Sequence, residues 1–217
     1  MYYKNRAEAG KLLLEELMKY RYEDCAVVAL DDGGVLVGEQ IAAGLHCILN
    51  LLVSEQIDVP GEGLSFGSVS QSGQFTYNSD FSDGQKEGYT TEFHGYLEEK
   101  KREAFQRINR LIGDGGTIDV EMLKGRNIIL VSDGLKDGAV LDVALEFLKP
   151  IYYQKLIVAS PISSVPAIDK VHILADEVHV LDVKENYMST DHYYDENDIP
   201  SHEDTVKKIN NIIINWQ

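Results

Sequence analysis

Residues 128–140 read Ile-Ile-Leu-Val-Ser-Asp-Gly-Leu-Lys-Asp-Gly-Ala-Val, and they are the most informative part of the chain. Four apolar residues, Ile128 to Val131, lead into a polar turn that contains two glycines, and an apolar-rich segment, Ala139 to Leu148, follows directly. A short continuous apolar run is typical of a buried parallel strand. The sequence therefore predicts a strand, a tight loop and a helix N-terminus, an arrangement that offers backbone N–H groups to an anion.

Strand and helix patterns continue on both sides of this stretch. Before it we predict a helix at 6–20, a strand at 26–30, a glycine turn at 31–34, a helix at 35–45, a strand at 47–53 and a helix at 96–112. After it we predict strands at 156–159 and 178–183 and a helix at 205–216. Residues 54–95 mix glycine, serine and aromatic residues with polar ones, which is typical of short antiparallel strands. We expect an α/β fold with a doubly wound, mostly parallel sheet, in a single domain over residues 1–217 with an inserted antiparallel flap at about 54–95.

The charge balance and the cysteines restrict the class of protein. The chain carries 36 acidic and 20 basic residues, a formal net charge of −16, which disfavours nucleic acid and anionic membranes as partners. No apolar run reaches the ~18 residues of a membrane helix, and the N-terminus lacks the apolar core of a signal peptide. We expect a cytoplasmic protein in which Cys25 and Cys47 are reduced thiols in the core.

Several motifs resemble those of the type I phosphoribosyltransferases. In that family a strand ends in two acidic residues, followed by two variable residues and then Thr-Thr-Gly-any-Thr or Ala-Thr-Gly-any-Thr. The equivalent loop here is Ser132, Asp133, Gly134, Leu135, Lys136, Asp137, Gly138, Ala139 and Val140. The turn of Asp31, Asp32, Gly33 and Gly34 resembles the family's Pro-Arg-Gly-Gly pyrophosphate turn. Arg6 with Ala9-Gly10 is similar to the opening helix, where Asp-Arg precedes Ala-Gly.

The resemblance implies a particular chemistry. Family members bind phosphoribosyl pyrophosphate with Mg²⁺ and transfer the phosphoribosyl group to a nitrogen, with loss of pyrophosphate. Asp133 is then the surviving acid that meets the ribose hydroxyls, and it is the candidate catalytic residue. Mg²⁺ is the implied cofactor if the protein is active, and a small molecule is the implied ligand. Relatives commonly dimerise, so the resemblance also implies a homodimer.

Three departures from the family pattern fall where relatives hold the donor: two sites that are basic in relatives are acidic or neutral here, and one hydroxyl site is acidic. Asp31-Asp32 stands where relatives have Pro-Arg, and Asp137 stands where they have the phosphate-holding threonine. Glu55-Gln56 stands where relatives often have Arg-Lys. At an effective dielectric of ~20, one like-charge contact near 4 Å costs about 4 kcal/mol before screening. Even at half that figure, three such changes would cancel most of the ~8 kcal/mol of a micromolar complex.

The residues themselves leave several roles open. Asp133 is either a ribose-binding acid or a loop acid that caps the next helix, and capping is the favoured role of Asp137. Because both loops follow parallel strands, Asp31, Asp32, Asp133 and Asp137 are also candidates for a site that binds Mg²⁺, Ca²⁺ or a cationic small molecule. Three hypotheses follow: an active divergent transferase, a catalytically impaired binding or regulatory module, and a divalent-cation-binding module. We favour the second.

Overall fold

The computed structural model of the chain describes residues 2–62, 64–113 and 118–214. They fall into two compact units. The first comprises Met1–Leu52, Ile118–Gly138 and Ile151–Gln217, and the second comprises Val53–Thr117 and Ala139–Pro150. The expected flap at about 54–95 falls within the second unit, and the assignment of the whole chain to one domain stays a prediction.

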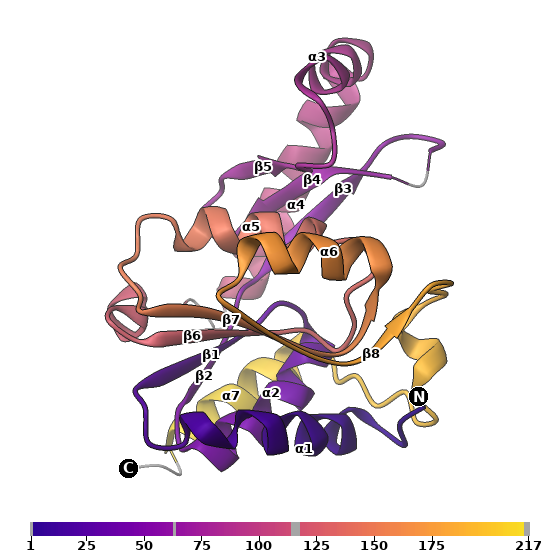
Figure 1. Cartoon of the computed structure of the whole chain (residues 1–217). Helices are drawn as coiled ribbons and strands as arrows, with labels where there is room; N and C mark the ends of the chain where they lie inside the picture. The colour runs from indigo at the N-terminus through magenta and orange to yellow at the C-terminus, as the bar shows by residue number, and fades with distance from the viewer. Residues whose placement is uncertain (1, 63, 114–117, 215–217) are drawn as a thin grey trace. The chain divides into compact units, whose positions relative to one another are not determined.

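A five-stranded parallel sheet forms the centre of the first unit (Figure 1). Its order is β2-β1-β6-β7-β8, and every neighbouring pair is parallel. The strands are β1 (Cys25–Ala29), β2 (Ile48–Leu51), β6 (Asn127–Val131), β7 (Lys155–Ser164) and β8 (Glu177–Lys184). Each residue of β1 and β6 is buried, which explains why both strands read as continuous apolar runs. The expected α/β fold with a mostly parallel sheet is confirmed.

Helices cover both faces of this sheet. Figure 1 shows α1 (Arg6–Leu17), α2 (Asp32–Leu45) and α7 (His202–Ile214) on one face and α6 (Val165–Leu174) on the other. The sequence analysis did not predict α6. Only Ala167 and Val171 of this helix are buried, so its apolar stripe is too thin to give a clear helical period. Its start signals were present, because Ser164 caps the helix and a proline occupies the first turn.

Helix α2 begins earlier than the sequence predicted. The expected turn at 31–34 is the N-cap and first turn of the helix, and Asp31 accepts a hydrogen bond from the Gly34 N–H. A Cβ atom on Gly34 would lie 2.7 Å from the Val131 carbonyl oxygen and 3.1 Å from the Cα of Ser132. The helix start therefore lies directly against the end of β6, and only glycine permits this approach.

The second unit is built on a three-stranded antiparallel sheet. Its strands are β3 (Ser54–Asp58), β4 (Ser65–Ser70) and β5 (Phe75–Tyr77). Helix α4 (His94–Ile112) packs on β3 and β4, and α5 (Ala139–Leu148) packs on β4 and β5. Helix α3 (Asp83–Glu92) was not predicted. It has no buried residues and so no amphipathic pattern, although Ser82 and Gln85 form a capping box.

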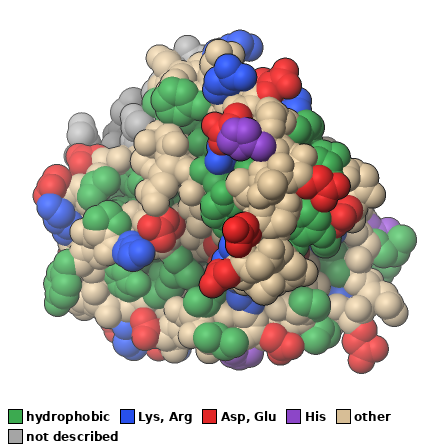
Figure 2. All heavy atoms as spheres, turned by 90° about the horizontal axis from the view of Figure 1, so that it is seen from above, with side chains coloured by type: hydrophobic (Ala, Val, Ile, Leu, Met, Phe, Trp, Pro, Cys, Tyr) green, Lys and Arg blue, Asp and Glu red, His purple; other side chains and the backbone are tan. Residues whose placement is uncertain are grey.

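Three expectations drawn from composition concern the cysteines, membrane helices and the surface charge. Cys25 and Cys47 are free and buried, as expected. Across the part of the chain that the structure describes, no helix combines the length and the apolar character needed to cross a bilayer. Figure 2 shows acidic and basic side chains interspersed over the visible face, with no single-sign patch.

We predict that Gly34→Ala destabilises the protein by about 1–3 kcal/mol, because the added methyl group overlaps the end of β6. Gly88→Ala is the matched control. Gly88 lies inside α3 and a Cβ atom there would meet nothing within 4 Å, so this change should stabilise by about 0.5–1 kcal/mol. Denaturant unfolding measures both effects, and shifts of the same sign would contradict the packing described for Gly34.

A pH-dependent contribution to stability is expected from Glu177 at the start of β8. Hydrogen bonds from Lys19, at 2.5 Å, and Lys155, at 3.1 Å, help lower the pKa of Glu177 from 4.5 to about 2. A depressed carboxyl pKa stabilises the folded state above pH 4.5, and this contribution is lost as the pH falls towards 2. We expect Glu177→Gln to cost up to about 1 kcal/mol at pH 7, given the partial exposure of the ion pairs. The difference from wild type should vanish in urea titrations near pH 2; a constant difference between pH 7 and pH 2 would contradict it.

Candidate functional site

A cavity of about 490 Å³ lies in the first unit, where β1 and β6 end. This is the edge at which open α/β sheets bind their ligands. The residues that line the cavity are Asp31, Asp32, Gly33, Asp133, Gly134, Thr190, Asp191 and Ile199. Four of them are aspartates, and neither lysine nor arginine is among them. The lining is therefore strongly acidic.

Asp31 uses its carboxylate to satisfy the chain's own donors. The carboxylate caps α2 through the Gly34 N–H, and it also accepts a hydrogen bond from Ser132 Oγ at 2.7 Å. N–H groups at a helix start are the donors that a phosphate would otherwise receive. Here an acidic side chain of the protein already occupies one of them.

Asp133 is held from behind the cavity by Arg6, the first residue of α1. Arg6 is fully buried, and its Nε donates to Asp133 Oδ2 over 2.6 Å. The guanidinium group lies 4.4 Å from the centre of the Tyr194 ring, and the Tyr194 hydroxyl donates to the Asp133 carbonyl oxygen at 2.6 Å. A Cβ atom on Gly33 would lie 2.1 Å from Asp133 Oδ2, so α2 reaches this pair only because residue 33 is glycine.

The two buried carboxyl groups of Asp31 and Asp133 influence each other. Burial and the charge of Asp31 raise the pKa of Asp133 well above its ordinary range, and the Arg6 charge opposes this only in part. Burial also raises the pKa of Asp31, against the hydrogen bonds from Ser132 and Gly34. Both shifts favour the neutral form of the carboxyl group, so the two groups disfavour being charged at the same time.

The opposite wall of the cavity comes from a late, irregular part of the chain. Arg6 Nη2 donates to Asp191 Oδ1 over 2.6 Å, so one guanidinium group contacts both a floor and a wall carboxylate. Thr190 is held by the Tyr187 hydroxyl at 2.9 Å. Asp32 lies at the start of α2, with its Oδ1 3.1 Å from His202 Nδ1 at the start of α7.

The four carboxylates that the sequence suggested as a cation site do not all line the cavity. Asp31, Asp32 and Asp133 line the cavity, whereas Asp137 does not. Asp191, which the sequence did not indicate, completes the acidic lining. Over residues 2–62, 64–113 and 118–214, no group of three or more His, Cys, Asp or Glu side chains is arranged to hold a metal. A cation site at Asp31, Asp32, Asp133 and Asp137 stays a prediction.

The loop that follows β6 is fixed to the end of β7. The Leu135 N–H donates to the Ile162 carbonyl at 2.9 Å, and the Leu135 carbonyl accepts from the Ser164 N–H at 2.8 Å. Ser164 Oγ also donates to the Lys136 carbonyl at 2.6 Å, while the Lys136 side chain is exposed. The main-chain groups of Leu135 and the Lys136 carbonyl therefore bond to β7 and its end, and these bonds hold the loop in place.

The end of the same loop has a special backbone. Gly138 has a φ of +38°, and a Cβ atom there would lie 2.5 Å from Lys170 Cδ. Glycine is therefore required both by the dihedral angle and by the close side chain. Ala139 and Val140, the last residues of the predicted loop, begin α5 in the second unit.

Arg6 is another residue whose role in the site the sequence analysis missed. The signal was available, because Arg6, Ala9, Gly10, Leu13 and Leu17 share the buried face of α1. An arginine on a buried helical face needs a carboxylate partner, since an unpaired buried charge is strongly unfavourable. The partner itself was not predictable from local sequence.

We predict that Arg6→Ala lowers the free energy of unfolding by about 3–5 kcal/mol, because it leaves a buried carboxylate without its cation. Lys4→Ala is the control. The Lys4 side chain is 67% exposed and lies 3.8 Å from Glu196, so its loss should change stability by less than about 0.5 kcal/mol. Equal effects of the two changes in denaturant unfolding would refute a structural role for the buried pair.

Comparison with known proteins places these features in a family. A relative from Mycobacterium tuberculosis, found in strains CDC 1551 and H37Rv and named only provisionally as a phosphoribosyl transferase, is 27% identical over 175 residues. This match covers 80% of the chain but 39% of the relative, so the chain spans less than half of that protein.

The fold itself is shared with a solved structure, that of TT1426 from Thermus thermophilus. It superposes with a TM-score of 0.73 at 24% identity and covers 100% of this chain and 99% of that one. The family model for the phosphoribosyl transferase domain matches residues 1–195. The chain belongs to the phosphoribosyl transferase domain family.

Proposed function

We propose that this chain does not catalyse transfer from phosphoribosyl pyrophosphate and instead acts as a binding or regulatory module for a small molecule. The proposal includes a cytoplasmic location and a homodimer. One observation carries it: the cavity at the ends of β1 and β6 is lined by four aspartates and by no lysine or arginine. A polyanion placed there would meet charge of its own sign.

The energetic argument concerns the phosphates of the donor. Each close contact between a phosphate and a carboxylate costs about 4 kcal/mol at an effective dielectric of ~20. Two such contacts equal the ~8 kcal/mol that a micromolar complex releases. Asp31 and Asp133 accept hydrogen bonds from Ser132 and Arg6, but Asp32 and Asp191 still face the same cavity. Tight donor binding is therefore disfavoured.

The nearby cation does not restore an anion site. Arg6 is fully buried behind the lining, and its guanidinium group already contacts Asp133, Asp191 and Asn197. To reach a phosphate, Arg6 would have to leave Asp133 and Asp191, and both carboxylates would then lack their cation. The helix start at α2 is likewise in use, because Asp31 accepts the Gly34 N–H.

A cationic ligand is the second candidate, and the same acidic lining favours it. Asp32 and Asp191 offer oxygen atoms to an amine or to a hard divalent ion. An active, divergent transferase would need Asp133 and Mg²⁺ to overcome the repulsion described above. The three functions differ in what they bind, so one set of titrations separates them.

We predict no binding of phosphoribosyl pyrophosphate with Mg²⁺ up to about 1 mM in calorimetry, because the cavity repels the phosphates. Heat from Mg²⁺ or Ca²⁺ alone would favour the cation-binding function. Micromolar donor binding together with pyrophosphate release on addition of an amine or nucleobase would establish an active transferase and refute the proposal.

Charge reversal sharpens this test. Asp32→Arg combined with Asp137→Thr, which restores one family residue in each loop, should raise pyrophosphate affinity by at least tenfold. Asp83→Arg makes the charge change of Asp32→Arg alone, at a fully exposed position on α3, and should leave the affinity unchanged. A similar gain in both variants would mean that net charge, rather than the cavity, controls anion binding.

A further inference from the structure

The wall of the cavity has two parts that come from distant regions of the chain. Residues 31–33 and 133–134 form what we call the floor, at the ends of β1 and β6. Residues 187–199, the rim segment, supply Thr190, Asp191 and Ile199. The width of the cavity therefore depends on what holds the rim segment in relation to the floor.

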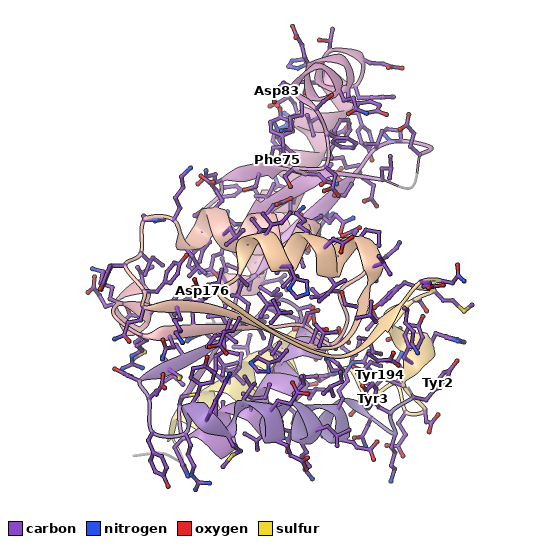
Figure 3. All side chains as sticks on the ribbon, viewed as in Figure 1. Tyr2, Tyr3, Phe75, Asp83, Asp176 and Tyr194 are labelled. Carbon is purple, nitrogen blue, oxygen red and sulfur yellow. The ribbon has the colours of Figure 1, made fainter. Side chains whose placement is uncertain are left out.

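Main-chain hydrogen bonds connect the rim segment to the N-terminal residues. The Tyr3 N–H donates to the Tyr193 carbonyl, and the Asp195 N–H donates to the Tyr3 carbonyl, both at 2.9 Å. The Glu196 N–H donates to the Lys4 carbonyl at the same distance. Figure 3 shows Tyr3 and Tyr194 side by side, with ring centres 5.9 Å apart. These bonds align the rim segment with residues 3–4 but do not reach the floor.

The side chains of Tyr194 and Arg6 connect the rim segment to the floor by hydrogen bonds. The Tyr194 hydroxyl donates to the Asp133 carbonyl oxygen at 2.6 Å. Arg6 donates from Nε to Asp133 and from Nη2 to Asp191, each at 2.6 Å, and from Nη1 to Asn197 at 3.1 Å. Of these two side chains, Arg6 is the one that contacts a floor carboxylate and a rim carboxylate that both line the cavity.

The guanidinium group is suited to this connection by its shape. It is planar, always charged, and presents its N–H donors at fixed angles, so two carboxylates bonded to it are held at a fixed separation. A lysine ammonium is a single point on a flexible stem and sets no such separation. Burial also strengthens the hydrogen bond from Arg6 to Asp133, because both side chains are nearly inaccessible to water.

We propose that Arg6 is a positioning residue that sets the geometry of the cavity by fixing Asp191 of the rim segment in relation to Asp133 of the floor. This goes beyond the proposed function, since it holds for any ligand of the cavity. Arg6 does not line the cavity and acts only through the two carboxylates.

Hydrogen–deuterium exchange tests the proposal without a known ligand. The amides of Asp195 and Glu196 are hydrogen-bonded and report the opening of the rim segment. In Arg6→Ala we expect exchange at 189–198 to be at least tenfold faster than in wild type, as for loss of a charge-assisted hydrogen bond. Exchange in β1 and β6 should rise much less. Lys4→Ala, which removes an exposed side chain beside the same segment, should exchange as wild type does.

Chemical rescue separates positioning from general stabilisation. Guanidinium ion at ~20 mM, far below denaturing concentrations, should enter the space left by Arg6→Ala and restore slow exchange at 189–198. Ammonium chloride at the same concentration should not, because it lacks the planar donor pattern. Faster exchange throughout the first unit with no guanidinium rescue would show that Arg6 is only structural and would overturn the proposal.

A second variant covers the case in which Arg6→Ala does not fold. Asp191→Asn keeps the buried pair and alters only the rim contact, at a side chain that is 52% exposed. We expect exchange at 189–198 to be about threefold faster, a smaller effect because the bond is partly screened by water. Unchanged exchange at 189–198 in this variant would overturn the proposal on its own.

Discussion

The buried ion pair between Arg6 and Asp133 connects the first helix of the chain to the end of its central strand. Its hydrogen bond measures 2.6 Å, and the arginine is excluded from water. Such a pair is costly to bury, so it persists only where further hydrogen bonds complete it. Here Asp191, Asn197 and Tyr194 complete it, and these residues bring the late part of the chain to the cavity. The start of α2 depends on the same pair, because Gly33 lies against the Asp133 carboxylate.

The fold of this chain is that of the phosphoribosyl transferase domain family, but its cavity carries acidic side chains that disfavour a phosphorylated ligand. The parallel sheet, the helix start after β1 and the loop after β6 form the kind of edge at which open α/β sheets bind anionic ligands. The side chains at those places are acidic, and the donors are partly used by the protein itself. Fold therefore indicates ancestry, whereas the ligand follows from the side chains that line the site.

Much of the fold was predictable from local pattern, and much of the site was not. The runs at 26–30 and 128–131 predicted central strands, because strands covered on both faces are apolar throughout. Helices α3 and α6 were missed since they bury few side chains or none. Asp31 and Asp133 share a cavity as the strand-end rule indicates, but Asp191 and Ile199 lie in an irregular segment far along the chain. Their position depends on contacts with residues 3–6, which no local pattern encodes.

Segments of the two units alternate along the chain, and this order affects how the protein folds during synthesis on the ribosome. Helix α5, which packs on β4 and β5, is synthesised about sixty residues after those strands, and β6 must enter the other sheet beside β1 after the whole of 53–117 has been made. Until then β1 has an open edge, and β4 and β5 lack one of their helices. Neither unit can complete its core during early synthesis, because α5 and β6 are made only after residues 53–117, and a break between residues 52 and 118 would separate β1 from its neighbour β6. The nascent chain is therefore expected to expose the open edge of β1 until residues 127–131 have emerged.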